Sequence, residues 1–151
     1  MFWGVFHDTT KGSGVFWEKN WGTIGEKTYR EHIVPVIAAY TTANLYLQLM
    51  QDHAPGHAAR GTQQDLQSRN VHSIIWPPYS PDLNPIETLW DWMKDYIYDR
   101  YGDIQLSYPR LRAAVLEAWE AIPVEKLEEL IQGMHDRCQA VIDAHGMHIK
   151  A

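Results

Sequence analysis

Two short apolar runs place the strongest constraint on the fold. Leu45–Met50 is nearly all apolar, and Val71–Trp76 is a second run of the same kind. Such runs suit β-strands that are covered on both faces, as in a mixed sheet with helices packed against it. Between them, Ala58–Arg69 is a weak helix candidate, because Leu66 is its only large apolar residue and Gly61 lowers helix stability.

The N-terminal part adds a hairpin and a helix to this pattern. Phe2–His7 and Val15–Lys19 are β-prone runs on either side of the turn-forming stretch DTTKGSG, which predicts a β-hairpin. The apolar spacing that begins at Glu26 predicts a helix, and Pro35 should kink or split it.

The C-terminal part is predicted to be helical. After a proline-rich stretch that favours an extended loop, three apolar stripes follow at helical spacing. They contain Ile86, Leu89, Trp90, Met93 and Ile97; Leu111, Val115, Trp119 and Ile122, with Ser107 as a cap; and Leu127, Leu130, Ile131, Met134, Cys138, Val141 and Ile142. We therefore expect one α/β domain over residues 1–151, with a central mixed sheet.

Composition and charge exclude some classes of protein. The only cysteine, Cys138, rules out an internal disulfide framework, and its place in an apolar stripe predicts a packed thiol rather than a nucleophile. No apolar run reaches about 18 residues, so we expect no membrane span, and the first residues do not form a secretion signal. The net charge of −6 argues against a strong general nucleic-acid footprint.

Two carboxylates stand at positions that suit chemistry as well as structure. Asp52 follows the first apolar run, and Glu87 opens a helix after 34 intervening residues. Asn84-Pro85-Ile86-Glu87 also reads as a capping box, in which Glu87 reaches back to the cap's N–H. Asp52 can likewise bond to backbone N–H groups of a turn. The functional alternative is that both acids meet and hold divalent metal.

Other candidate residues have simpler interpretations. His53 and His57 have the spacing of a helical zinc site, but Pro55 makes a continuous helix improbable there, so we expect no dedicated zinc site. Trp76 and Tyr79 could stack on nucleic-acid bases. We favour the alternative, in which both rings pack the proline-rich loop against the sheet.

With these residues in place, the chain resembles the catalytic domain of mariner-superfamily DDE transposases. The resemblance rests on QDHAPGH at Gln51–His57 and on WPPYSPDLNPIETLW at Trp76–Trp90. The opening FWGVF strand and the spacing between Asp52 and Glu87 support it. A lone capping box would be weak, whereas the two motifs at this distance are a specific combination.

This resemblance implies an RNase H-like fold and an enzyme that cleaves DNA and transfers its strands. In this family three acids bind two divalent ions, Mg²⁺ or Mn²⁺, and by motif position Asp52 is similar to the second acid and Glu87 to the third. Both would be catalytic metal ligands, with side chains that converge on one cleft. The resemblance also implies transposon and target DNA as partners, a possible homodimer and location in the nucleus.

Two departures from the family pattern modify these expectations. His53 stands where the family commonly has Asn. The family's first acid lies on a strand before FWGVF, and we expect that strand and the upstream DNA-binding region to be missing here. Asp8 lies in the predicted hairpin turn, so we do not expect it to replace the first acid. We therefore expect a partial domain with little or no activity alone; the alternative is a non-catalytic DNA- or protein-binding domain derived from a transposase.

Overall fold

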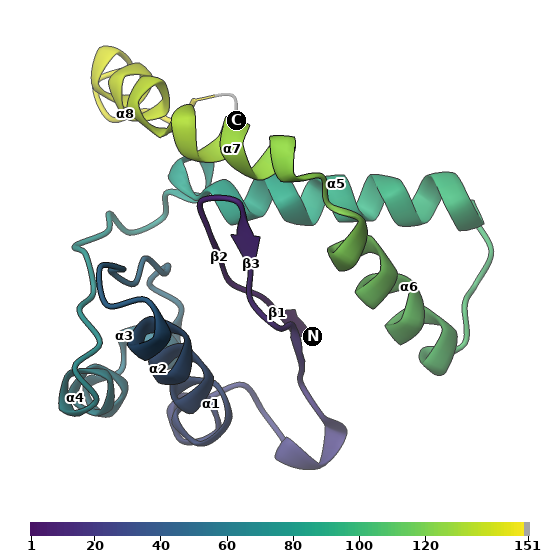
Figure 1. Cartoon of the computed structure of the whole chain (residues 1–151), viewed down its shortest axis with the longest axis horizontal. Coiled ribbons are helices and arrows are strands. Elements are labelled where there is room, and N and C mark those ends of the chain that lie inside the picture. Colours follow the sequence, from purple (N-terminus) through teal and green to yellow (C-terminus); the bar gives the residue numbers. More distant parts are fainter. Residues whose placement is uncertain (150–151) are drawn as a thin grey trace. The chain divides into compact units, whose positions relative to one another are not determined.

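The computed structural model describes residues 1–149, which form two compact units (Figure 1). Unit 1 comprises residues 1–16 and 81–149, and unit 2 comprises residues 17–80. Unit 1 contains β1 (Phe2–Trp3), β2 (Phe6–His7), β3 (Thr10–Lys11), β4 (Val15–Phe16), η2 (Pro81–Leu83), α5 (Pro85–Tyr101), α6 (Tyr108–Ala121), α7 (Val124–Gln132) and α8 (Met134–Asp143). Unit 2 contains η1 (Lys19–Trp21), α1 (Glu26–His32), α2 (Val34–Ala43), α3 (Pro55–Ala58) and α4 (Arg60–Ser68).

The predicted β-hairpin is confirmed at the start of unit 1. β1 pairs with β4, with Phe2 opposite Phe16, and β2 pairs with β3, with Phe6 opposite Lys11; both pairs are antiparallel. Asp8 lies at the tip with a φ of 44°, a left-handed conformation that Asp tolerates in turns. Asp8 is therefore a turn residue, as the sequence predicts.

Aromatic rings pack this hairpin against the helices of unit 1. The buried core consists of Leu89, Met93, Ala118, Trp119, Ile122, Leu127 and Leu130, contributed by α5, α6, α7 and the turn after α6. The Phe2 ring lies 5.8 Å from Trp90 and 5.7 Å from Trp119, measured between centroids. Trp119 also donates from Nε1 to Gly12 O at 3.1 Å, which satisfies its polar atom in a buried place. The first two predicted helical stripes are confirmed as α5 and α6, except that Leu111 of the second stripe is 43% exposed.

The Lys11 side chain caps the C-terminal end of α6. Its Nζ donates to the carbonyl oxygens of Trp119 at 2.7 Å, Glu120 at 2.9 Å and Ile122 at 3.1 Å. Carbonyls at this end of a helix lack intrahelical donors and carry partial negative charge, so a cation is well placed there. Burial lowers the pKa of the Lys11 amine, and the Glu120 carboxylate opposes this effect.

The third helical stripe is divided at Gly133, where α7 meets α8. Leu127 and Leu130 of α7 are buried, whereas no residue of α8 is. The prediction of a packed Cys138 thiol is wrong. The apolar side of α8 is not buried against other described residues, so Cys138 is exposed. Ser107 precedes α6 as predicted, but its side chain makes no cap hydrogen bond.

Helices α1 to α4 form the body of unit 2, as Figure 1 shows. Pro35 splits the predicted first helix, so that α1 and α2 meet at Ile33. Tyr29, Ile33 and Ile37 are at most 2% exposed, and they form the buried side of this helix pair. The weak helix prediction is also confirmed, because α4 lies within it and buries Leu66.

The two predicted buried strands of unit 2 are much shorter than expected. Leu49 and Ser73 form one isolated parallel bridge, in which the Leu49 backbone bonds to the residues on either side of Ser73. Leu45 is 87% exposed and Ile75 is 100% exposed, so the prediction that both runs are covered on two faces is wrong. The physical reason is that no further strand pairs with them among residues 1–149, and two strands without neighbours are marginal.

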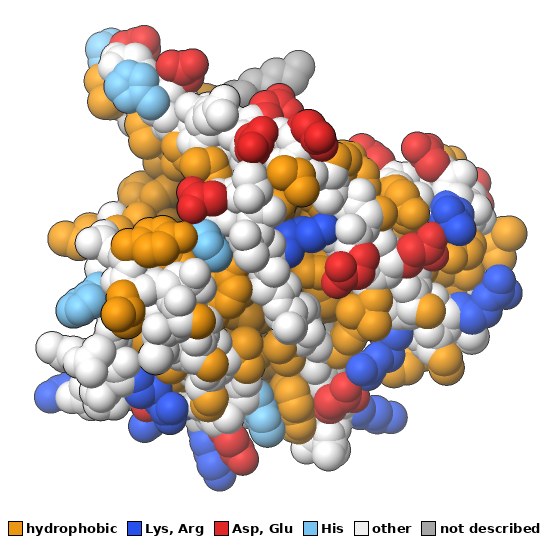
Figure 2. Space-filling model, viewed as in Figure 1, with side chains coloured by type: hydrophobic (Ala, Val, Ile, Leu, Met, Phe, Trp, Pro, Cys, Tyr) orange, Lys and Arg blue, Asp and Glu red, His pale blue; other side chains and the backbone are white. Residues whose placement is uncertain are grey.

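Hydrophobic side chains (orange in Figure 2) also lie on the surface of the chain. The largest exposed fractions, besides those of Leu45 and Ile75, belong to Tyr46, Tyr79, Ile104 and Met147.

No helix within residues 1–149 has the length and apolar character to cross a membrane. Short sheets, a parallel bridge and flanking helices together make a mixed α/β chain whose C-terminal part is helical, as expected.

Candidate active site

Asp52 lies in a tight turn shortly after the parallel bridge. Its Oδ1 accepts hydrogen bonds from Ala54 N at 3.1 Å and from His57 Nδ1 at 2.5 Å. The bond to Ala54 confirms the turn interpretation of Asp52. The side chain nevertheless remains 55% exposed, and no hydrogen bond within residues 1–149 occupies its Oδ2. A ligand from solution can therefore reach the Asp52 side chain.

Helix α1 supports the residues on both sides of Asp52. Tyr29 is 2% exposed, and its ring centroid lies 4.4 Å from that of His57. The Tyr29 hydroxyl donates to Gln51 Oε1 at 2.9 Å. The buried Tyr29 side chain thus contacts both Gln51, which precedes Asp52, and His57, which binds the Asp52 carboxylate.

His53 and His57 have different partners. His53 Nε2 lies 2.6 Å from Trp76 O, whereas His57 binds Asp52. Trp76 is half-buried beside this contact, but Tyr79 is 91% exposed and has a φ of 55°. The prediction that Tyr79 packs against a sheet is wrong. The proline-rich stretch, which was expected to be an extended loop, contains a turn at Pro78 and Tyr79, and the Tyr79 ring contacts no buried core among the described residues.

Glu87 occupies the first turn of α5, as the sequence predicts. Asn84 is the N-cap residue, its Oδ1 accepts from Ile86 N at 3.3 Å, and Pro85 follows it. The Asn84 N–H donates to Pro81 O at 3.0 Å, which satisfies this backbone donor. The cap is confirmed for Asn84 and Pro85, and the Glu87 carboxylate lies at the positive end of the helix dipole.

C-terminal residues of unit 1 hold the segment before α5. Arg137 of α8 donates from Nη1 to Asp82 O at 3.2 Å and from Nη2 to Thr88 Oγ1 at 3.4 Å. Ile149 N donates to Asp82 Oδ2 at 2.8 Å, and His148 Nδ1 lies 3.5 Å from the same oxygen. The hydrogen bond from the Ile149 amide is the main cause that lowers the pKa of Asp82, and desolvation by burial acts in the opposite direction and raises this pKa. The start of α5 is therefore fixed from outside the helix.

One side of α5 carries an acid at every fourth position. Glu87, Asp91, Asp95 and Asp99 are the four residues, and side chains with this spacing are neighbours on a helix. Lys94 Nζ lies 2.5 Å from Asp91 Oδ1. Asp91 raises the pKa of Lys94 most, and Glu87 and Asp95 add to it. The negative charge near Glu87 favours a cation.

The donor chemistry of the two acids suits Mg²⁺ or Mn²⁺, which prefer oxygen ligands. Asp52 offers an exposed carboxylate side chain, and Glu87 offers a carboxylate at a helix start. In residues 1–149, however, no three His, Cys, Asp or Glu side chains gather closely enough to hold one ion. Asp52 belongs to unit 2 and Glu87 to unit 1, so their convergence on one cleft stays a prediction.

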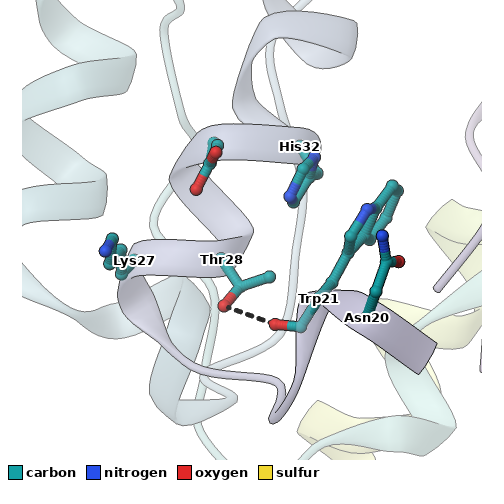
Figure 3. A pocket seen from close by; sticks show the side chains of 6 residues that line it. Asn20, Trp21, Lys27, Thr28 and His32 are labelled. Atoms are coloured by element: carbon teal, nitrogen blue, oxygen red, sulfur yellow. Dashed lines mark hydrogen bonds between the residues drawn. The ribbon is translucent and has the colours of Figure 1, made fainter. Parts of the chain in front are cut away.

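An open pocket in unit 2 is lined by other residues. Figure 3 shows its walls, which come from η1 and α1: Asn20, Trp21, Lys27, Thr28, Glu31 and His32. Trp21 stacks on His32 with 3.7 Å between ring centroids and 3° between ring planes. Thr28 Oγ1 donates to Trp21 O at 3.5 Å. None of the residues predicted from the sequence as site residues lines this pocket.

Solved structures show the same fold. The Mos1 transposase catalytic domain, in a structure with raltegravir and Mn, matches 99% of this chain and 76% of its own chain, with a TM-score of 0.80 at 17% identity. The catalytic domain of the Mos1 mariner transposase in a second crystal structure also gives a TM-score of 0.80, at 15% identity. The chain therefore has the RNase H-like α/β fold of that domain, which confirms the predicted fold class.

The sequence belongs to a specific family within this fold. Residues 6–105 match the DDE superfamily endonucleases, so the chain is a member of that family. It is 35% identical over 156 residues to the transposable element Tc1 transposase of Caenorhabditis elegans and 33% identical over 153 residues to the Tcb1 transposase of Caenorhabditis briggsae. Each alignment covers 99% of this chain and 54% of the relative. The chain thus spans about half the length of these relatives, and the predicted resemblance is confirmed.

The sequence carries little signal for some residues around the two acids. The spacing of His53 and His57 suggests only a zinc site, although the short turn within QDHAPGH is compatible with a contact between His57 and Asp52. Asp82 and Arg137 carry no comparable signal, because 55 positions separate them. The family match includes both Asp52 and Glu87, whose roles stay predictions.

Proposed function

We propose that this chain is the catalytic part of a Tc1/mariner-type transposase, in which Asp52 and Glu87 bind Mg²⁺ or Mn²⁺ as the second and third acids. Family membership over a stretch that contains both residues carries the proposal. The names of the relatives, which are transposases, support it. So do the structures of the Mos1 catalytic domain with Mn and with Mg.

In this proposal the two acids act as metal ligands and do not donate or accept protons. A bound Mg²⁺ or Mn²⁺ pair supplies activation of the attacking oxygen and stabilisation of the leaving oxygen in an in-line displacement at phosphorus. Asp52 and Glu87 contribute the anionic oxygens that retain the cation. The Ala54 amide binds the Asp52 carboxylate, and Asn84 fixes the helical turn that carries Glu87.

DNA is the partner that follows from this proposal, and the nucleus is the matching location. A homodimer on DNA is part of the same proposal. Because the net charge is −6, binding to the phosphate backbone has to come from local groups of cations rather than from the overall charge.

The chain alone is expected to cleave DNA weakly or not at all. The family's chemistry uses three acids, and the resemblance assigns two of them within residues 1–149. Nicking of supercoiled plasmid in Mg²⁺ or Mn²⁺ tests this for the unmodified chain, Asp52→Ala and Glu87→Ala. We expect little nicking and no change on substitution. Robust nicking that Asp52→Ala abolishes would refute the inactivity and support the assigned site.

Binding of Mn²⁺ tests the metal ligands independently of cleavage. Paramagnetic Mn²⁺ broadens NMR signals of nuclei close to it, so a titration of the labelled chain locates the ion. We expect broadening around residues 52 and 87, weakened by Asp52→Ala and by Glu87→Ala. Asp103→Ala is the control, because Asp103 is an exposed acid beyond the end of α5. Broadening centred elsewhere, or equally reduced by the control, would exclude the proposed ligands.

A non-catalytic DNA-binding role is the second candidate, and the exposure of Tyr79 favours it. This ring is 91% exposed, and a base stacked on an aromatic ring contributes roughly 1–3 kcal/mol. In this case Tyr79→Ala weakens binding to single-stranded DNA in a band-shift assay, whereas Asp52→Ala and removal of divalent ions with EDTA leave it unchanged. Loss of binding with Asp52→Ala favours the catalytic assignment instead.

A further inference from the structure

We infer that His57 is a positioning residue for Asp52: together with the Ala54 amide it holds Oδ1, so that Oδ2 is the oxygen that Asp52 presents to a divalent cation. The inference rests on the proposed function, because it concerns the same carboxylate. It adds a residue, a direction of hydrogen bonding and a single ligand atom to that proposal.

The hydrogen bonds at Asp52 distinguish its two oxygens. Each carboxylate oxygen has about two lone-pair directions. At Oδ1 these are taken by Ala54 N at 3.1 Å and His57 Nδ1 at 2.5 Å. No hydrogen bond within residues 1–149 uses Oδ2, and the side chain is 55% exposed. Asp52 is thus arranged to bind a cation through one oxygen.

His57 is itself held from several elements of unit 2. Its side chain is only 20% exposed, and the buried Tyr29 ring of α1 packs beside it at 4.4 Å. Its backbone N donates to Ala54 O at 2.8 Å, and its backbone O accepts from Gln63 Nε2 of α4 at 2.7 Å. A side chain with these constraints can fix a neighbour, which is what orienting groups around metal ligands do.

The chemistry of the contact fixes the imidazole tautomer. An ionised carboxylate only accepts hydrogen bonds, so the proton of a neutral His57 must be on Nδ1. The hydrogen bond therefore runs from His57 Nδ1 to Asp52 Oδ1. If His57 only occupied a position in α3, without the contact to Asp52, nothing would favour the Nδ1–H tautomer.

Long-range ¹H–¹⁵N NMR of the full chain tests the contact without any metal. Recorded where the imidazole is neutral, the spectrum is expected to show His57 as the Nδ1–H tautomer. In Asp52→Ala the population should move towards the Nε2–H form, because the acceptor is gone. An Nε2–H tautomer in the unmodified chain, or no change in Asp52→Ala, would overturn the inference.

Titration with Mn²⁺ tests the effect on the cation site, with line broadening near residue 52 as the readout. We expect His57→Ala to weaken Mn²⁺ binding by about tenfold, the lower end of the range for groups that orient metal ligands. His57→Asn places an amide donor at the position of Nδ1 and should restore most of the affinity. His57→Gln places its donor at the position of Nε2 and should not.

Two further variants separate the inference from the proposed function. His53→Ala is the matched control, because His53 adjoins Asp52 but binds Trp76 O, and it should leave Mn²⁺ binding unchanged. If Asp52→Ala leaves Mn²⁺ binding unchanged, the proposed function fails. If Asp52→Ala abolishes binding but His57→Ala does not weaken it, or His53→Ala weakens it equally, the positioning role fails. If the unmodified chain binds no Mn²⁺, the metal role and the assignment of Oδ2 both fail.

Discussion

Single side chains in this protein satisfy backbone groups that lie far away in the sequence. Lys11 of the hairpin donates to three carbonyl oxygens of residues 119, 120 and 122. Asp82 accepts from the amide of Ile149. We expect contacts of this kind to cost more when broken than surface ion pairs do, because most of them are partly buried and one side chain serves several backbone groups.

The first prediction concerns Lys11. Lys11→Met keeps most of the aliphatic stem but removes the donor, so three carbonyls at the end of α6 lose their shared cation. We expect the free energy of unfolding of unit 1 to fall by roughly 1–3 kcal/mol, measured by urea denaturation with tryptophan fluorescence. Lys94→Met is the control: its side chain is 72% exposed and pairs with Asp91 on the surface, so a change within about 0.5 kcal/mol is expected. Equal losses would contradict this view of Lys11.

The second prediction concerns the pH dependence of Asp82. The Ile149 amide lowers the pKa of this carboxyl in the folded chain, so folding favours the ionised form. Its contribution is fully present above the unfolded pKa of about 3.9 and is lost as the pH falls through the lower folded pKa. We expect Asp82→Asn to be less stable than the unmodified chain at pH 7 and the difference to shrink as the pH falls below about 4. Urea denaturation at several pH values measures this, and a constant difference would contradict it.

At the scale of elements, the hairpin and α5 could be predicted because their signals are local. Turn-forming residues between two β-prone runs specify the hairpin, and Asn84 followed by Pro85 specifies the start of α5. The apolar run at residues 45–50 was predicted as a buried strand, but a strand's extent depends on partners that its own sequence does not contain. The same holds for Cys138, because an apolar stripe on α8 shows which side could be buried and not whether a core is present.

The third prediction tests how tightly the hairpin packs. A Cβ at Gly14 would lie 2.1 Å from Phe2 Cζ, and the Phe2 ring cannot move aside because it packs on Phe16, Trp90 and Trp119. We expect Gly14→Ala to lower the free energy of unfolding by about 1–3 kcal/mol, the usual cost of overpacking.

A double-mutant cycle supplies the control for Gly14→Ala. In a Phe2→Leu background the clashing ring atoms are absent, so Gly14→Ala should cost clearly less there than in the unmodified chain. Urea denaturation of the four proteins gives the coupling energy. If the effects of Gly14→Ala and Phe2→Leu on the free energy of unfolding are additive, the hairpin backbone accommodates the added Cβ without displacing the Phe2 ring.

At the scale of the whole molecule, charge is divided unevenly between the two units. The chain has 13 basic and 19 acidic residues, and residues 17–80 contain five of each. Unit 2 is therefore neutral, and the net charge of −6 lies on the remainder of the chain. Within unit 2, Arg30 and Arg69 are paired with Asp65, whereas no ion pair of the described residues involves Lys19, Lys27 or Arg60. These three cations, here called the unpaired cations, remain available to phosphate.

The fourth prediction is that the unpaired cations dominate any binding to DNA. Replacing all three by Gln should weaken binding to a labelled duplex and reduce the slope of log affinity against log salt by about 0.9 for each lost phosphate contact. Fluorescence anisotropy between about 50 and 200 mM salt measures both quantities. The matched control replaces Arg69, Lys94 and Lys126 by Gln, because each is already paired with a carboxylate. The two triple variants change the net charge equally, so similar losses of affinity would show that overall charge, and not the unpaired cations, governs the interaction.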